Sequence, residues 1–85
     1  MKHTRKQIAE RAEKLLAKYW ESKRPQPRKP EIWYAAAVWV VQWNLECEKP
    51  FTQMELADLS NTLQGNISND AWRLRAWIKK SRTVI

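Results

Sequence analysis

The sequence predicts an all-α fold, a compact domain of four helices. One Gly and four Pro in 85 residues are too few for a protein built from many strands and tight turns, whereas the abundant Ala, Leu, Lys, Arg, Glu and Gln favour helices. Two capping-box patterns, Thr4 with Gln7 and Thr52 with Glu55, mark helix starts. A chain of this length forms one domain, so a single core is expected for residues 1–85.

The first helix is expected over residues 5–23, directly after the box formed by Thr4 and Gln7. Apolar residues follow at helical spacing and give this helix a core face: Ile8, Ala12, Leu15, Leu16 and Tyr19. The opposite face is basic and carries Arg5, Lys6, Arg11, Lys14 and Lys18. Charges in this pattern are typical of a solvated face. The segment is therefore predicted to be a basic amphipathic helix.

A basic connector is expected over residues 24–30, because its prolines cannot continue a helix. Each proline lacks an N–H donor and restricts the residue before it. The connector is either a stiff linker between two helices or an arm in which Arg24, Arg28 and Lys29 contact phosphates.

A second helix is expected over residues 31–47, buried in the middle of the fold. Between residues 32 and 41 the only polar side-chain atoms are the tips of Trp33, Tyr34 and Trp39, and a helix that is apolar all round is a buried helix. The β-branched content of residues 38–43 leaves a strand as the alternative, but the three Ala before it favour a helix. Six Trp, two Tyr and one Phe in the chain supply bulky core material.

The C-terminal third is expected to form two helices with a turn between them. The Thr52 and Glu55 box starts a short helix over residues 53–59, whose apolar side contains Met54, Leu56, Ala57 and Leu59. Residues 60–67 include Asn61, Gly65 and Asn66, which tolerate turn geometry, so we expect a turn there, with at most one helical turn around residues 62–64.

The last helix is expected over residues 69–80. Ser68 is a natural N-cap, and Asp70 in the first turn suits the positive end of the helix dipole. Ala71, Leu74 and Ile78 repeat on one side, and Ile67 precedes them. The other side contains several Arg and Lys, so this helix is predicted to be amphipathic with a cationic outer face.

The net charge of +7 is distributed unevenly along the chain. Residues 1–30 contain ten Lys or Arg and three acidic residues, residues 31–68 contain one and five, and residues 69–85 contain five and one. A basic N-terminal arm and a basic C-terminal helix therefore flank an acidic middle. Segregated charge of this kind indicates a charged partner and says little about the fold.

The C-terminal third, residues 51–85, resembles a helix-turn-helix DNA-binding unit of the small phage or plasmid regulator type. In that unit one helix braces a second, whose outer side enters the major groove. Residues 53–57, with the small Ala57, resemble the first helix, and Ile67 resembles the apolar residue ahead of the recognition helix. The long expected turn makes winged-helix relatives an equally close match. The chain has room for no more than one short strand after residue 80, so a wing is expected to be absent, rudimentary or supplied by a partner.

The resemblance implies a DNA-binding protein, sequence-specific or structural, that acts as a small transcription regulator on duplex DNA. Arg73 and Arg75 would divide between a guanine edge and phosphates, because guanidinium binds either in a bidentate manner. A homodimer would double the limited contact area of one small domain. The residues expected to contact DNA are Asn69, Trp72, Arg73, Arg75, Lys79, Lys80 and Arg82, with Arg24, Arg28 and Lys29 from the connector.

Catalytic, metal and cofactor sites are not expected. The single Cys47 and the single His3, placed in an N-terminal tail, provide neither a nucleophile with its base nor a metal cluster, and Cys47 is expected to be a small core residue. No Gly-rich phosphate loop is present. The sequence contains no apolar run near 18 residues and no secretory signal pattern, so a cytoplasmic protein with no membrane partner is expected.

A protein-binding role is the alternative to DNA binding. Exposed Trp with Arg is the composition of an interface hot spot, so the chain can instead be a small inhibitor or adaptor, of phage or plasmid type, that docks on a host protein or nucleoprotein complex. Trp72 and Trp77 are read either as packing residues or as stacking platforms. RNA binding through such stacking is a third reading, although the chain resembles none of the common RNA modules.

Overall fold

Four helices make up the computed structural model, which describes residues 2–22 and 30–83. They are α1 (Arg5–Ser22), α2 (Pro30–Asn44), α3 (Gln53–Leu59) and α4 (Gln64–Ser81). The described residues form no strand, and their one β-type contact is an isolated parallel bridge between His3 and Cys47. No β-hairpin follows α4 as far as residue 83. The prediction of an all-α, four-helix fold is confirmed.

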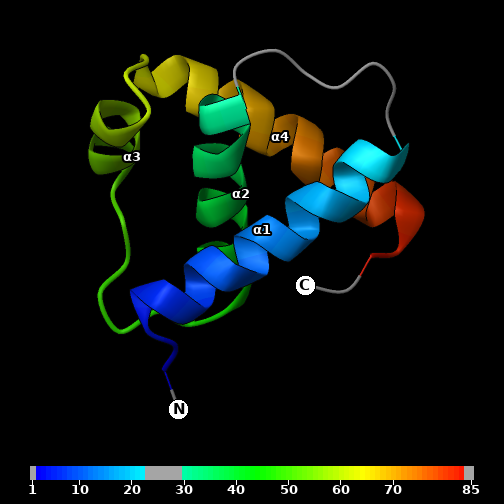
Figure 1. Cartoon of the computed structure of the whole chain (residues 1–85), viewed down its shortest axis with the longest axis horizontal. Helices are drawn as coiled ribbons and strands as arrows, with labels where there is room; N and C mark the ends of the chain where they lie inside the picture. Colours follow the sequence, from blue (N-terminus) through cyan, green and yellow to red (C-terminus); the bar gives the residue numbers. More distant parts are fainter. Residues whose placement is uncertain (1, 23–29, 84–85) are drawn as a thin grey trace.

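The helix α2 lies at the centre of the fold and contacts each of the other three helices. In Figure 1, α1 crosses in front of α2, α4 passes behind it and α3 lies beside it. This position explains why α2 is apolar around most of its circumference, because three helices pack against it. Its Val40 and Val41 are fully enclosed, and Trp33 is 6% exposed. Burial weakens toward the C-terminal end of α2, where Trp43 is 57% exposed.

The packing of α1 follows its expected apolar pattern. All five residues expected on its core face are buried. At its start, Gln7 N–H donates to the Thr4 hydroxyl at 3.2 Å and Thr4 N–H donates to the Gln7 side chain at 2.9 Å, so the expected capping box forms. Near the end of α1, the Tyr19 ring stacks on the Trp33 ring of α2, with 5.1 Å between ring centroids. It also contacts the Trp77 ring of α4 edge-on, with 5.2 Å between centroids. Tyr19 thus joins three helices.

The loop between α2 and α3 begins three residues earlier than expected, because α2 ends at Asn44 rather than at Cys47. The N-terminal segment explains the difference. His3 N–H donates to the Glu46 carbonyl oxygen at 2.7 Å, and the His3 carbonyl oxygen accepts from Glu48 N–H at 2.9 Å. These bonds hold residues 46–48 in an extended pairing instead of a last helical turn. His3 is accordingly part of the fold and not of a free tail.

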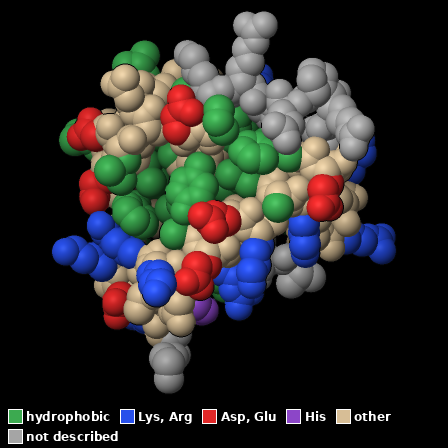
Figure 2. Space-filling model, in the orientation of Figure 1, with side chains coloured by type: hydrophobic (Ala, Val, Ile, Leu, Met, Phe, Trp, Pro, Cys, Tyr) green, Lys and Arg blue, Asp and Glu red, His purple; other side chains and the backbone are tan. Residues whose placement is uncertain are grey.

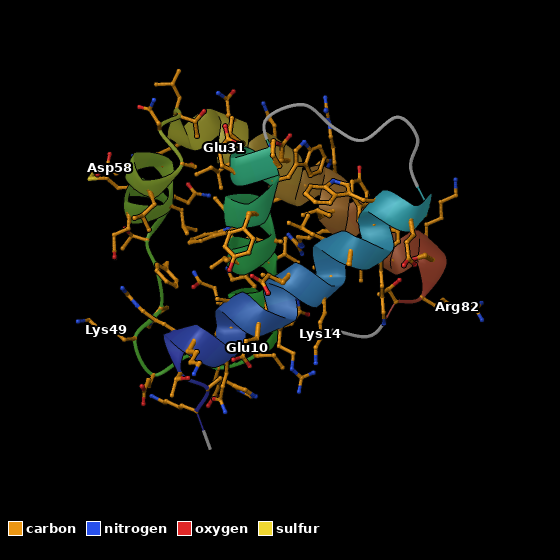
Figure 3. The ribbon with its side chains drawn as sticks, in the orientation of Figure 1. Glu10, Lys14, Glu31, Lys49, Asp58 and Arg82 are labelled. Carbon is orange, nitrogen blue, oxygen red and sulfur yellow. The ribbon has the colours of Figure 1, made fainter. Side chains whose placement is uncertain are left out.

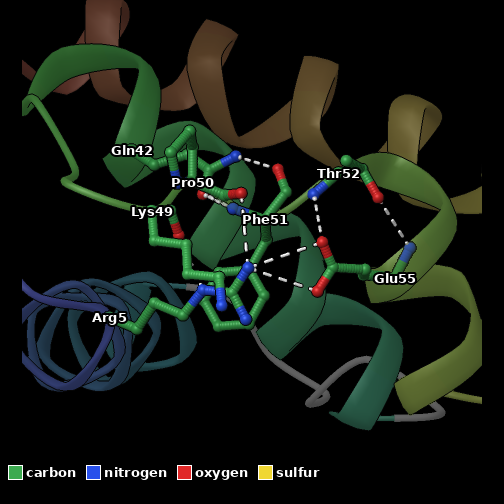
Figure 4. A network of polar contacts seen from close by, with 7 residues as sticks. All are labelled: Arg5, Gln42, Lys49, Pro50, Phe51, Thr52 and Glu55. Atoms are coloured by element: carbon green, nitrogen blue, oxygen red, sulfur yellow. Dashed lines mark hydrogen bonds and ion pairs between the residues drawn. The ribbon is translucent and has the colours of Figure 1, made fainter.

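Arg5 ties the start of α1 to this loop and to α3 (Figure 4). Its Nε donates to the Lys49 carbonyl oxygen at 2.6 Å, and its Nη2 lies 3.2 Å from Glu55 Oε2. The guanidinium carbon is 4.1 Å from the centroid of the Phe51 ring, which is a cation–π distance. A planar guanidinium can make these contacts simultaneously. Arg5 therefore stabilises the fold and does not belong to the solvated face on which it was expected.

The start of α4 corrects the expected turn and N-cap. The turn covers residues 60–63, the helix starts at Gln64, and its N-cap is Leu63, so Ser68 lies inside the helix. Starting early places Ile67 on the buried side, where it is 0% exposed. Burying such a side chain contributes about 1.5–3 kcal/mol, whereas a Gly within a helix costs about 1 kcal/mol. Packing therefore outweighs the local turn preference of the Gly and Asn residues.

Candidate nucleic-acid interface

A tight turn connects α3 to α4. The Thr52 and Glu55 capping box forms at the start of α3, as the sequence predicts. Residues 60–63 then lead directly into α4, and helix-turn-helix units use turns of three or four residues. Asn61 has a φ of 53°, in the left-handed region that Asn adopts more readily than most residues. The turn is therefore four residues long, shorter than the eight residues (60–67) that the sequence predicts.

Packing on one side of α4 determines which side faces solvent. Ile67, Ala71 and Leu74 are buried, and α2 is the main neighbour of α4. The opposite side is exposed over the whole helix, because its residues recur at helical spacing away from the core. We call this side the outer face of α4 and define it by the exposed residues Gly65, Asn69, Trp72, Arg73, Arg75, Ala76, Lys79 and Lys80.

The structure brings the six predicted residues of α4 together on this outer face. Trp72 is 71% exposed, so it does not pack into the core of the described residues. Trp77, by contrast, is half-buried against Tyr19. The six predicted residues are Asn69, Trp72, Arg73, Arg75, Lys79 and Lys80.

The remaining predicted residues lie elsewhere. Arg82 is the C-cap of α4, with a left-handed φ of 55°. Figure 3 shows it at one end of the molecule, far from Asp58 and Lys49 at the other. At 1.5 Å per residue, the segment from Asn69 to Arg82 spans about 20 Å. Three predicted residues, Arg24, Arg28 and Lys29, fall outside the described residues.

A small cleft beside the outer face joins α4 to α2 and α3. Its volume is about 270 Å³, and the lining includes Gln53 of α3 and Asn69 and Trp72 of α4. The Arg75 guanidinium lies 4.5 Å from the centroid of the Trp43 ring. Stacking on a ring fixes the guanidinium plane while leaving its N–H groups free to bind. Arg75 is therefore held in place yet remains available to a partner.

Trp43 and two residues at the start of α4 were not predicted as site residues. Because α2 is apolar all round, its sequence gives no sign of which Trp reaches the surface. The sequence predicts a turn at Gln64 and Asn66, but both are exposed in the first turn of α4. The signal that identifies them is Ile67, whose spacing from Leu74 extends the apolar stripe back toward residue 64.

Asp70 and Arg73 lie one helical turn apart at the side of α4 that approaches α1. Burial raises the pKa of Asp70 above its ordinary value, and the charge of Arg73 opposes that rise. Burial also raises the pKa of Tyr19, while Arg73 lowers it and Asp70 raises it further. The three groups therefore share one electrostatic environment, and part of the Arg73 field is offset by Asp70.

The other cations of the outer face have no acidic partner. In the described part of the chain the ion pair is Arg5 with Glu55, so Arg75, Lys79 and Lys80 are unpaired with carboxylates. Lys79 and Lys80 lie in the last turn of α4, where the helix dipole favours positive charge. This surface thus presents positive charge that the fold itself does not neutralise.

Within residues 2–22 and 30–83, no group of three or more His, Cys, Asp or Glu is placed to hold a metal ion. The described helices include none that is long and apolar enough to cross a membrane. Comparison with known protein families, with curated proteins and with solved structures found no match to this chain.

Proposed function

We propose that this protein binds duplex DNA through the outer face of α4, as a small transcription regulator or another DNA-binding accessory factor. The observation that carries the proposal is the exposed and unneutralised cationic face on the second helix of a helix–turn–helix unit. In such units the N-terminal part of the second helix enters the major groove, and the first helix crosses the backbone. Here α4 is the recognition helix and α3 supports it.

The N-terminal half of α4 suits base contacts. Asn69 is exposed there, and the first turn adds the amide side chains of Gln64 and Asn66. Asn and Gln amides bind adenine edges, Arg binds guanine, and apolar groups contact the thymine methyl group. Arg73 provides a group that can bind guanine, and Trp72 provides an apolar group that can contact the thymine methyl group. Gly65 lies on the same face, and its position leaves open space where a side chain would be, which permits a close approach by DNA.

The C-terminal half of α4 suits phosphate contacts. This half contains three cations: Lys79, Lys80 and Arg82. They lie up to about 20 Å from Asn69 along the helix axis, so one helix bound to DNA could contact bases at one end and phosphates at the other. Arg75 is already oriented by Trp43. Phosphate contacts position a protein on DNA without reading sequence. The N-terminal half of α4 therefore reads base edges, and the C-terminal half positions the protein on the DNA backbone.

The test is fluorescence anisotropy of a labelled mixed-sequence duplex titrated with the protein between about 50 and 200 mM salt. We expect micromolar or tighter binding and a steep fall in affinity with salt. Replacing Arg73 and Arg75 with Ala should reduce the salt slope by up to about 2, because each phosphate contact contributes about 0.9. Lys14→Ala with Lys18→Ala on α1 removes the same charge from exposed positions of another helix and is the matched control.

Equal losses in the two double variants would show that net charge, and not α4, accounts for binding. Absence of binding at the lowest salt would exclude the proposal. A homodimer would double the contact area, as is common for readers of this size, and sedimentation of the protein with and without duplex measures its stoichiometry directly.

Docking on another protein is the second candidate function, and one observation favours it. Trp43 and Trp72 are 57% and 71% exposed and line one cleft with Arg75. Trp and Arg are the residues most enriched in interface hot spots. This candidate replaces DNA binding if the duplex titration is negative while Trp72→Ala reduces binding to a protein partner.

A further inference from the structure

A second surface lies on the face of the molecule that Figure 2 displays, where apolar side chains gather between α1 and α3 in front of α2. They surround a groove of about 590 Å³. Each of the three helices contributes to its walls, and the outer face of α4 contributes nothing. We call it the α1–α3 groove; its apolar lining includes Leu16, Trp20, Tyr34, Val38, Phe51 and Leu59.

The α1–α3 groove is an open surface site. Leu59 on its α3 side is 75% exposed, and Trp20 and Phe51 are half-buried. A volume of this size lies within the range of ligand-binding pockets, about 300–1,000 Å³. An open, apolar groove between helices is the shape that accepts an amphipathic helix.

The charge of the groove selects its occupant. Its charged lining residues are Glu13 on α1 and Glu31 at the start of α2, and no Lys or Arg lines it within the described residues. This is notable in a chain of net charge +7. Carboxylates beside an apolar floor favour a partner that combines apolar side chains with Lys or Arg.

A second copy of this chain fits the groove poorly. A two-fold dimer formed through this surface would place Glu13 and Glu31 of both copies in one interface. Like charges brought together in an interface oppose binding. A basic occupant has no such penalty, because its cations would meet those same carboxylates.

An unsatisfied donor lies in the same wall. The indole nitrogen of Trp20 is buried and has no hydrogen-bond partner among the described residues. A buried donor without an acceptor is costly. The donor is enclosed in this structure, so an occupant meets the apolar lining and the two carboxylates and not this atom.

We propose that the α1–α3 groove binds an amphipathic helical segment of a partner protein, with apolar residues on one face and Lys or Arg beside them. Leu59, Tyr34 and Trp20 contact its apolar face, and Glu13 and Glu31 pair with its cations. The site is separate from the outer face of α4 and does not depend on DNA binding.

The probe is a labelled model peptide of Leu and Lys, patterned as an amphipathic helix about four turns long, with a matched peptide in which every Lys is Glu. Anisotropy with the full chain should show that the Lys peptide binds and that the Glu peptide binds at least about tenfold more weakly. Equal binding of the two peptides, or no binding of the Lys peptide, would overturn the proposal.

Matched variants locate the site. Leu59→Lys should weaken binding of the Lys peptide by about tenfold or more, whereas Leu63→Lys should not, because Leu63 is equally exposed, at 76%, but does not line the groove. Glu13→Lys and Glu10→Lys form a second pair on α1, of which only Glu13 lines the groove. Far-UV circular dichroism confirms that each variant is folded. Equal effects within each pair would place the peptide elsewhere and refute the assignment.

Sedimentation of the protein alone tests the competing occupant. If the wild-type chain associates with itself and Leu59→Lys abolishes that association, the groove is filled by a second copy and the proposal is wrong. A monomer, or a dimer that Leu59→Lys leaves intact, supports a groove open to another protein.

Discussion

The start of α1 and the outer face of α4 are both cationic, but Arg5 of α1 is bonded to other parts of the fold, whereas Arg75 of α4 has no acidic partner in the described part of the chain. Arg5 donates to the Lys49 carbonyl, pairs with Glu55 and covers the Phe51 ring. Arg75 stacks on Trp43 and has no ion pair in the described part of the chain. Arg5 would have to break its hydrogen bond and its ion pair before it could neutralise a phosphate. Arg75 has no ion pair to break in the described part of the chain and can bind a phosphate directly. Counting Lys and Arg along the sequence therefore overstates the phosphate-binding surface.

The two sides of α4 differ in a similar way, because one side is packed into the fold and the other is not. Its inner side fills the core, and its outer face contacts little of the protein. If this is correct, substitutions on the inner side should change stability, and substitutions on the outer face should change binding. The predictions below test that division, beginning with the largest effect.

Leu74→Ala should reduce the free energy of unfolding by about 2–5 kcal/mol, because Leu74 is fully buried and its loss leaves a cavity. Trp72→Ala, two residues away on the outer face, should change it by no more than about 0.5 kcal/mol despite the larger side chain removed. Urea denaturation followed by circular dichroism measures both. A loss above about 1 kcal/mol for Trp72→Ala would mean that the outer face also supports the fold.

Arg5→Ala should reduce the free energy of unfolding by about 1–2 kcal/mol, allowing for the partial exposure of the Arg5 and Glu55 pair. Arg5→Lys should be intermediate, because an ammonium group lacks the planar fork that reaches two partners. Arg11→Ala, on an exposed position of the same helix, is the control and should have little effect. The salt slope of DNA binding should remain unchanged in Arg5→Ala, and a reduced slope would show that Arg5 contacts phosphate after all.

Local signals in the sequence are sufficient for the number of helices and for the starts of α1 and α3, but not for the partners of individual side chains. The capping boxes at Thr4 and Thr52 identify two helix starts, because a box involves residues only three positions apart. Whether Arg5 is solvated or bonded depends on the loop that contains Lys49, which lies 44 residues further along the chain. No pattern within α1 distinguishes Arg5 from Arg11.

Two further differences have a similar origin. Local preference placed a turn at Gly65 and Asn66, but the tertiary gain from burying Ile67 extends α4 through them. In α2, Trp33 and Trp43 look alike in sequence, yet one is 6% and the other 57% exposed. Which end of a central helix remains uncovered depends on the length and position of its neighbours. For this reason the sequence indicates the exposed residues of α4 from Asn69 onward, but not Gln64 and Asn66 in its first turn or Trp43 beside it.

Gly65→Ala separates stability from binding on the outer face. A Cβ added at Gly65 meets nothing within 4 Å, and its φ is not in the left-handed region. Ala should therefore stabilise the fold by up to about 1 kcal/mol, through the lower entropy of the unfolded chain. If DNA approaches the first turn of α4 closely, the same variant should bind duplex more weakly. A variant that is more stable and binds DNA equally well would exclude close contact at this turn.

Asp70→Asn should have the smallest effect on stability, and its sign depends on pH. Burial raises the pKa of Asp70 above its ordinary value of 3.8, with Arg73 opposing the rise. The folded state then holds the proton more tightly than the unfolded state, so the contribution of Asp70 to stability is present below pH 3.8 and lost as pH rises through the raised pKa. Above that pKa the ionised carboxylate lowers stability, and the Asn variant lacks this penalty.

The Tm of Asp70→Asn minus that of the wild type should accordingly be near zero at low pH and rise to at most about 3 °C at neutral pH, since the group is only half-buried. Asp58→Asn, exposed on α3, is the control and should show no such rise. Because the substitution also removes the acid that offsets Arg73, duplex affinity should increase by about twofold to threefold at low salt. A Tm difference that falls with pH would mean that Asp70 is stabilised as a carboxylate, and Arg73 would then be a structural partner of Asp70, as Arg5 is of Glu55, and not a cation available to DNA.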